Sequence, residues 1–279
     1  ATAFGSDRWG GPPTAADTGH AYLGYLNFAL ARYRRIDDAY AEPHDQLRSW
    51  LAAGLSEPIH RYQTYPGEVY PADLATVAGS LALYDPPPEL ANWMVRYAAA
   101  SVDPETGMLY QRLSTTSGAP ADQPRGSGTA FSAFFLEPAD PDLSAALTAS
   151  LNHRSFLGFG GIREYPVGVR GRGDIDSGPV LFGIGVSATG FGIAAARLHG
   201  EAAHYRALVR TATLFGLPVP LHGGQWHLTG GGIGNAIMLA MLTATSAEVA
   251  GGDGLLTVRG DPPAGGVGTG GDHLSQRRP

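Results

Sequence analysis

The feature that most constrains this chain is a series of short apolar segments of helical length, separated by loops rich in glycine and proline. In the first segment, Leu23, Leu26 and Leu30 recur at the spacing of one helix face. Segments that alternate apolar and polar residues are few and short, so few strands are expected. We predict a first helix across Tyr22–Tyr33, and further helices over 42–60, 71–84, 88–101, 127–136, 141–153, 179–198, 201–215 and 232–248.

Helices that follow one another in pairs, with longer loops between the pairs, are typical of an α/α toroid. We therefore predict an all-α fold, a barrel of helix hairpins, with short β-hairpins in the loops. The predicted toroid forms a single domain over 1–250 and begins with an N-terminal arm at 1–13. Residues 251–279 are rich in glycine and proline and poor in apolar residues, which predicts a C-terminal tail.

The composition excludes several classes of chemistry. The chain has no cysteine and its 19 basic residues are all arginine, so thiol nucleophiles, thiolate metal sites and lysine Schiff bases are excluded. A net charge of −6 predicts no binding to nucleic acid. No run of eighteen apolar residues occurs, so no transmembrane segment is expected. The start at Ala1, without methionine, favours a secreted or periplasmic location over a cytoplasmic one.

Two acidic loops stand out because each precedes an apolar helical segment. In the first, Glu68 and Asp73 flank a Tyr-Pro pair. In the second, Glu164 precedes another Tyr-Pro pair, and Asp174 and Asp176 follow in a glycine-rich span. Structural roles remain open, since acids near a helix start interact favourably with its dipole, and an Arg–Glu pair can fasten a loop. If the two loops meet in a pocket, the carboxyl groups can act as general acid and base.

Other candidates are chosen for what their side chains can do in such a pocket. His20, in the first turn of the first helix, could assist a proton transfer. Aromatic side chains and an arginine could bind the substrate; these candidates are Tyr65, Tyr70, Tyr165, Arg125 and Trp226. His222 and His227 flank a loop without helical context, so no metal site is predicted there. No cofactor is expected.

The order of several short motifs resembles the linalool dehydratase/isomerase-like family of α/α-barrel proteins. The resemblance extends over about 18–201 and is diffuse. Its motifs are Gly19-His20, Pro71-x-Asp73, Leu83-Tyr84-Asp85, Asp103-Pro104-Glu105-x-Gly107, Asp140-Pro141-x-Leu143-Ser144 and Arg163-Glu164.

The resemblance implies a toroid with its active site at one mouth, a homo-oligomer, and a pocket lined by His20. The chain departs from the family at the pocket cysteines, where Tyr70 stands near the place of one of them. The family's first helices also have no counterpart, so we expect a barrel incomplete at its N-terminus, closed by the glycine-rich arms or by another subunit.

Three functions follow from these observations. The first is an acid/base hydro-lyase or isomerase that acts on a small apolar, terpenoid-like alcohol. The second is a carbohydrate-active hydrolase or lyase, in which a carboxylate pair cleaves a glycan. The third is a secreted structural or assembly protein that retains the barrel without catalysis. The shape of the pocket separates the first two, since an alcohol enzyme needs a closed apolar cavity and a glycosidase needs an open cleft.

Overall fold

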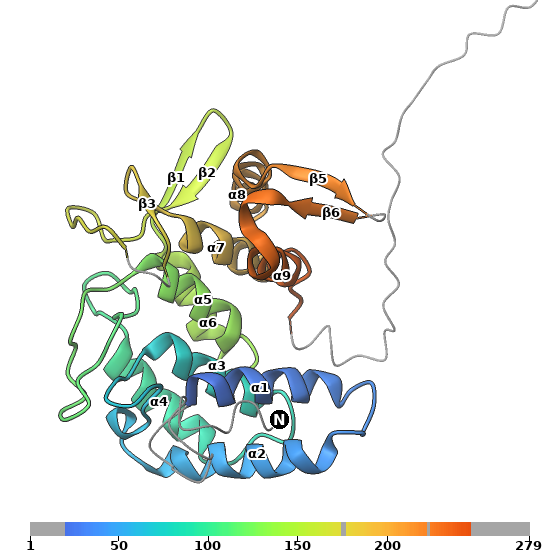
Figure 1. Ribbon diagram of the computed structural model, residues 1–279. Coiled ribbons are helices and arrows are strands. Elements are labelled where there is room, and N and C mark those ends of the chain that lie inside the picture. Colours follow the sequence, from blue (N-terminus) through green and yellow to red (C-terminus); the bar gives the residue numbers. More distant parts are fainter. Residues whose placement is uncertain (1–19, 174–176, 222–223, 247–279) are drawn as a thin grey trace, which may run out of the picture.

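The computed structural model describes residues 20–173, 177–221 and 224–246. Within them the protein is mostly helical, with three two-stranded antiparallel sheets. Figure 1 shows the helices rising from α1 and α2, past α5 and α6, to α7, α8 and α9. None of the described helices is long and apolar enough to cross a membrane.

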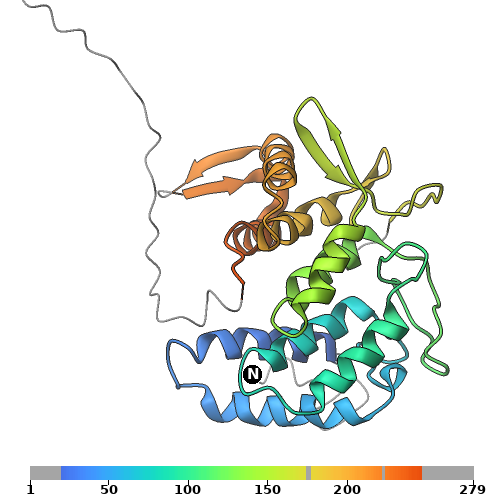
Figure 2. The ribbon, with the colours of Figure 1, turned by 180° about the vertical axis from the view of Figure 1, so that it is seen from behind.

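Five helices form a row in which each packs against the next, while the other four lie beside it (Figures 1 and 2). The row consists of α1 (His20–Tyr33), α3 (Pro71–Ala82), α5 (Gly126–Leu136), α7 (Val186–Leu198) and α9 (Gly231–Leu242). The flanking helices are α2 (Ala41–Ala53), α4 (Leu90–Ser101), α6 (Pro141–Ser150) and α8 (Ala202–Gly216). Each flanking helix packs against a member of the row, so the chain advances by helix pairs, as predicted. The described residues form no closed barrel.

The strands belong to three hairpins. They are β1 (His153–Phe156) with β2 (Phe159–Ile162), β3 (Val180–Leu181) with β4 (Ile184–Gly185), and β5 (Pro218–Leu221) with β6 (Gly224–His227). Short 3₁₀ turns are η2 (Gly54–Ser56), η3 (Ile59–Arg61) and η4 (Leu228–Gly230). The prediction of short β-hairpins in the loops is confirmed.

The helix starts follow the sequence signals. Pro71 occupies the first turn of α3, and Pro141 occupies that of α6. At α6 the Asp140 carboxylate also caps the helix, accepting a hydrogen bond from the backbone N–H of Leu143 at 2.9 Å. Residues 103–107 form a turn, in which the N–H of Gly107 donates to the carbonyl of Asp103 at 2.8 Å.

Four predicted helix boundaries are wrong. The helix predicted over 232–248 ends at Leu242. The helix predicted over 42–60 ends at Ala53, because Gly54 and Pro58 interrupt it and two 3₁₀ turns follow. The helix predicted over 141–153 ends at Ser150, and β1 begins at His153. The helix predicted over 179–198 begins only at Val186, because β3 and β4 occupy the residues before it. Phe182 and Gly183 form the turn between these two strands, both with positive φ, a conformation that glycine adopts without strain.

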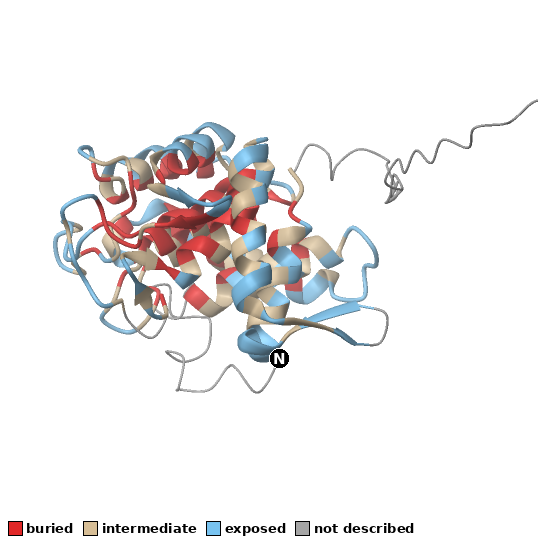
Figure 3. Cartoon of the chain, turned by 90° about the horizontal axis from the view of Figure 1, so that it is seen from above, coloured by how far each residue is buried: buried red, intermediate tan, exposed pale blue. Residues whose placement is uncertain are grey.

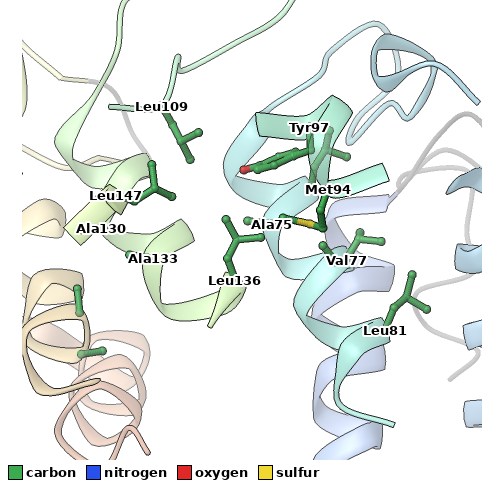
Figure 4. Close-up of a cluster of buried hydrophobic side chains, with 14 of the residues drawn as sticks. Ala75, Val77, Leu81, Met94, Tyr97, Leu109, Ala130, Ala133, Leu136 and Leu147 are labelled. Atoms are coloured by element: carbon green, nitrogen blue, oxygen red, sulfur yellow. The ribbon is translucent and has the colours of Figure 1, made fainter. Parts of the chain in front are cut away.

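The core lies where α3, α4, α5 and α6 meet. Figure 3 shows the buried residues gathered towards the centre of the molecule. Side chains from these four helices face one another in Figure 4, among them Ala75, Met94, Leu136 and Leu147. By contrast, Leu208 is the only fully buried residue of α8, and Met241 that of α9. The core therefore covers the row of helices most completely from α3 to α7. This part of the row carries most of the candidate site.

The closest approach in the row is between α3 and α5. A Cβ on Gly79 of α3 would lie 1.8 Å from the backbone carbonyl oxygen of Phe135 in α5. Only a residue without a side chain fits there, so Gly79 sets the distance between the two helices. These helices carry Asp73 and Ser127, which face a common pocket.

Candidate active site

A pocket of about 210 Å³ opens along the helix row. It is lined by residues from α1, α3, α5 and α7 and from the loops before α3, before α5 and after β2, namely Tyr25, Tyr65, Tyr70, Ala72, Asp73, Gln111, Ser127, Gly128, Phe131, Ser177 and Phe191. Five of these residues are aromatic, and polar groups come from three tyrosines together with Asp73, Gln111, Ser127 and Ser177. Aromatic walls with several polar groups are typical of a site for a small molecule that has both apolar and polar parts.

Asp73 supplies the carboxylate of this pocket among the described residues. It lies in the first turn of α3, where the helix dipole stabilises negative charge. The hydroxyl of Tyr25 donates a hydrogen bond to Asp73 Oδ1 over 3.1 Å. Removal of the phenol from water, together with the neighbouring Asp73 charge, raises the pKa of Tyr25 above its ordinary value. Tyr25 therefore stays protonated and holds Asp73 towards the pocket.

Glu164 is fully buried beside the pocket. The hydroxyl of Ser127, in the first turn of α5, donates to Glu164 Oε1 over 2.6 Å. The backbone of Glu164 is held on both sides, since its N–H donates to the carbonyl of Gly183 at 3.1 Å and its carbonyl accepts from the N–H of Gly126 at 2.7 Å. Burial of a carboxyl group costs free energy unless the group is hydrogen-bonded, so these contacts fix the position of Glu164.

Gly185 gives the Glu164 carboxyl group the room that it occupies. A Cβ on Gly185 would lie 2.2 Å from Glu164 Oε2 and 3.2 Å from its Cβ. Any side chain at position 185 would push the carboxyl group out of place. The helix predicted over 179–198 would have included Gly185, whereas in the structure this glycine ends β4 and faces an acid.

Ser127 connects the two acidic loops. It lines the same pocket as Asp73 and is bonded to the buried Glu164. The loop before α3 and the loop after β2 therefore meet around α5, and Tyr65, Tyr70 and Asp73 line the pocket. Ser177, which follows Asp174 and Asp176 in the chain, lines it as well. Asp174, Asp176 and the side chain of His20 lie outside the described residues.

The remaining predicted residues are not among those that line the pocket. Glu68 lies in a tight turn in which its backbone pairs with that of Tyr65. The Tyr165 hydroxyl accepts a hydrogen bond from the N–H of Gly173 at 3.2 Å, and the Arg125 guanidinium lies 5.4 Å from the centre of the Tyr165 ring. Trp226 belongs to β6, which packs against α9. Glu68, Tyr165 and Arg125 therefore shape loops near the site. Trp226 lies on a different part of the molecule.

Several pocket residues were not predicted. Tyr25, Gln111, Phe131 and Phe191 line the pocket, yet each belongs to a segment in which the sequence shows only helical periodicity or a loop. Ser127 had a local signal, since it stands in the Arg-Gly-Ser-Gly sequence from which Arg125 alone was chosen. A hydroxyl group at a helix start, next to two glycines, could have indicated a residue that approaches another loop closely.

A second, wider groove of about 530 Å³ is lined by acids and by the loop after Pro120. Its Asp103 accepts hydrogen bonds from Thr106 Oγ1 at 2.6 Å and from the Tyr110 hydroxyl at 2.9 Å. Partial burial raises the pKa of Asp103, but these hydrogen bonds and two from backbone N–H groups lower it further, so the net shift is downward. A carboxylate held ionised in this way is a poor proton donor, and the groove is the weaker candidate for acid/base chemistry.

No protein-family model matches the chain, and comparison with curated proteins finds no significant relative. The arrangement of residues is therefore the basis for a functional proposal.

Proposed function

We propose that this protein is an acid/base enzyme of the linalool dehydratase/isomerase-like type, a hydro-lyase or isomerase that acts on a small apolar, terpenoid-like alcohol. One observation carries the proposal. Ser127 faces a small aromatic pocket together with Asp73, while its hydroxyl is bonded to the buried Glu164. Two carboxyl groups in unlike surroundings thus serve one pocket, an arrangement that separates their acid and base roles.

In the proposed reaction, Asp73 acts as the base, because its carboxylate accepts a hydrogen bond from Tyr25 and lies at the positive end of a helix. It takes a proton from the carbon next to the departing hydroxyl, and the C–H electron pair forms the double bond. Glu164, protonated in its buried position, passes its proton to Ser127 as Ser127 gives its own to the departing hydroxyl, and the C–O bond breaks with release of water. Water in the pocket returns the proton from Asp73 to Glu164. Addition of water at another carbon, by the reverse steps, gives the isomerase reaction.

The size and lining of the pocket support a small substrate over a glycan. A volume of about 210 Å³ is below the range of pockets for drug-sized ligands, roughly 300–1,000 Å³. Tyr25, Tyr70, Phe131 and Phe191 provide apolar walls. A glycosidase needs two carboxylates that face each other across the substrate. Among the described residues, Asp73 alone brings a carboxyl group to the wall, so the carbohydrate-active alternative has less support.

The wider architecture is part of the proposal. We propose that the helix row belongs to an α/α toroid and that the protein is a homo-oligomer. Apolar side chains on and next to the last helix of the row support this, since Ile233 is 79% exposed, Leu239 66% and Phe215 65%. Exposed apolar residues in such number support the proposal that another subunit covers this surface. A secreted or periplasmic location remains a proposal on the sequence features alone.

The test is turnover of a panel of small terpenoid alcohols, followed by gas chromatography, with soluble glycans assayed in parallel. Asp73→Asn and Glu164→Gln keep the shape of the side chains and remove the acid. We expect each to lower kcat by about 10²–10⁴-fold. Glu68→Gln is the matched control, because Glu68 lies in the first acidic loop but does not line the pocket, and it should retain activity within about twofold.

Each result decides between the alternatives. Turnover of an alcohol that survives in both Asp73→Asn and Glu164→Gln would contradict the proposed roles. Turnover of glycans but not of alcohols would favour the carbohydrate-active alternative. If the parent protein turns over neither class, the non-catalytic structural role is favoured.

A further inference from the structure

Two histidines and a glutamate gather at the junction of α8 and the first hairpin. Glu201 precedes the first residue of α8, and His204 follows three positions later on the same face. His153 is the first residue of β1, which pairs with β2, and β2 packs against α8. One nitrogen or oxygen atom from each of the three side chains lies within 4.8 Å of the other two. The cluster shares no residue with the pocket described above.

The distances suit a metal ion of the first transition series. His204 Nδ1 lies 2.9 Å from Glu201 Oε2, and His153 Nε2 lies 4.0 Å from the same oxygen. Zinc bonds of about 2.0–2.2 Å in a tetrahedral site place neighbouring ligand atoms roughly 3.4 Å apart. The two observed distances lie on either side of this value. Because the lone pair of an imidazole nitrogen lies in the ring plane, the two stacked rings must turn out of parallel for both nitrogens to reach one ion.

The two imidazole rings of the cluster lie in direct contact. Their rings stack with centroids 3.8 Å apart and planes 6° from parallel, which disfavours protonation of both. His153 Nε2 is buried and makes no hydrogen bond to a described residue. A neutral imidazole with an unused nitrogen is the form that binds metal.

We propose that His153, Glu201 and His204 bind one divalent transition-metal ion of the zinc type. Two imidazoles and a carboxylate are a set of ligands that zinc takes, and three protein ligands leave a fourth position for water. The amino-terminal end of α8 carries partial positive charge and disfavours a bare cation, so the negative charge of Glu201 is essential to the site. The ion would fasten the start of α8 to β1, which come from parts of the chain about fifty residues apart.

The test is titration of the untagged full chain, first freed of metal with a chelator, with ZnCl₂ in a calorimeter. We expect one zinc ion per chain. His153→Ala, His204→Ala and Glu201→Gln should each weaken binding by at least about 10-fold. His60→Ala is the control, because His60 lies on η3, which packs against α4 outside the cluster, and it should bind zinc like the parent. Zinc should also raise the Tm of the parent by about 5 °C at a hundredfold excess over Kd, and that of His204→Ala by much less.

Cobalt provides a second readout that does not depend on stability. Co²⁺ bound by this set should give visible absorption bands in the parent, and these should be absent in His153→Ala. Zinc binding of equal strength in the parent, His153→Ala and His204→Ala would overturn the proposal, as would no binding by the parent. His204 is 43% exposed, so its substitution should leave the fold intact, and circular dichroism of each variant checks this. Because the cluster lies outside the pocket, alcohol turnover tests the proposed function independently of this result.

Discussion

Glu164 is held in one place by its surroundings. Its carboxyl group has no exposure to solvent and is bonded to the hydroxyl of Ser127, and its backbone is fixed at both ends. A buried acid beside a pocket is where shifted proton affinities and chemistry coincide most often. The same contacts also fasten the loop to α5. A structural role of Glu164 predicts variants that lose stability, whereas a catalytic role predicts variants that lose activity.

Ser127→Ala tests the structural role of this hydrogen bond through its effect on stability. Loss of the hydroxyl removes a hydrogen bond to a buried carboxyl group, and we expect the free energy of unfolding to fall by about 1–3 kcal/mol. Urea denaturation measures this change. Ser56→Ala is the control, since its hydroxyl bonds the Ala53 carbonyl at the surface, and it should change stability by less than about 0.5 kcal/mol. Equal effects of the two substitutions would show that Ser127 does not support Glu164.

His44 predicts a dependence of stability on pH. Burial, and then the nearby Arg34, lower the pKa of this fully buried imidazole below its ordinary value of about 6.5. Between the two values the unfolded chain takes up a proton that the folded chain does not, so stability falls as the pH drops below about 6.5. The urea midpoint should be lower at pH 5.5 than at pH 7.5. The difference should be smaller in His44→Gln, and an unchanged difference would assign the effect to other groups.

At the scale of elements, the sequence predicted most helices but not all of their ends. Pro71 and Pro141 give clear starts, and the structure confirms both. The run before Val186 was predicted as helix, because a short apolar segment has no periodicity that separates helix from buried strand. The candidate site was predicted in part, since Asp73 and Glu164 carry local signals. Tyr25, Phe131 and Phe191 reach the pocket only through helix packing, which no local pattern shows.

Because α3 and α5 approach closely, one added methyl group at Gly79 is expected to lower the stability of the fold. Gly79→Ala would place a Cβ 1.8 Å from the carbonyl oxygen of Phe135, so the helices must separate. We expect a loss of about 1–3 kcal/mol in the free energy of unfolding. Gly190→Ala in α7 is the matched control, because open space surrounds that position, and it should be neutral or stabilise by up to about 1 kcal/mol. Thermal and urea unfolding measure both, and a neutral Gly79→Ala would contradict the close packing.

At the scale of the whole molecule, the row of helices is unevenly covered. Its middle is enclosed by α4 and α6, whereas α9 at one end keeps most of its apolar side chains partly or fully exposed. A helix of this composition is expected to be buried on most sides. The exposed surface therefore predicts an assembly larger than the single chain.

That prediction is tested by light scattering after size-exclusion chromatography. We expect a mass at least twice the 29.1 kDa of one chain. Ile233→Glu combined with Leu239→Glu should shift the protein to the monomer, because charges would be placed in the covered surface. Val95→Glu, on α4 and 71% exposed in the single chain, should leave the mass unchanged. A parent protein that elutes as a monomer would contradict both the oligomer and the coverage of α9.

The space beside Glu164 has a consequence for evolution. Position 185 accepts no side chain while an acid occupies position 164, because the two would overlap. The two positions should therefore change together, so that lineages with glutamate at 164 keep glycine at 185, and those that lose the acid are free to vary the glycine. Their joint presence would mark the descendants that retained the site, even where the rest of the sequence has diverged.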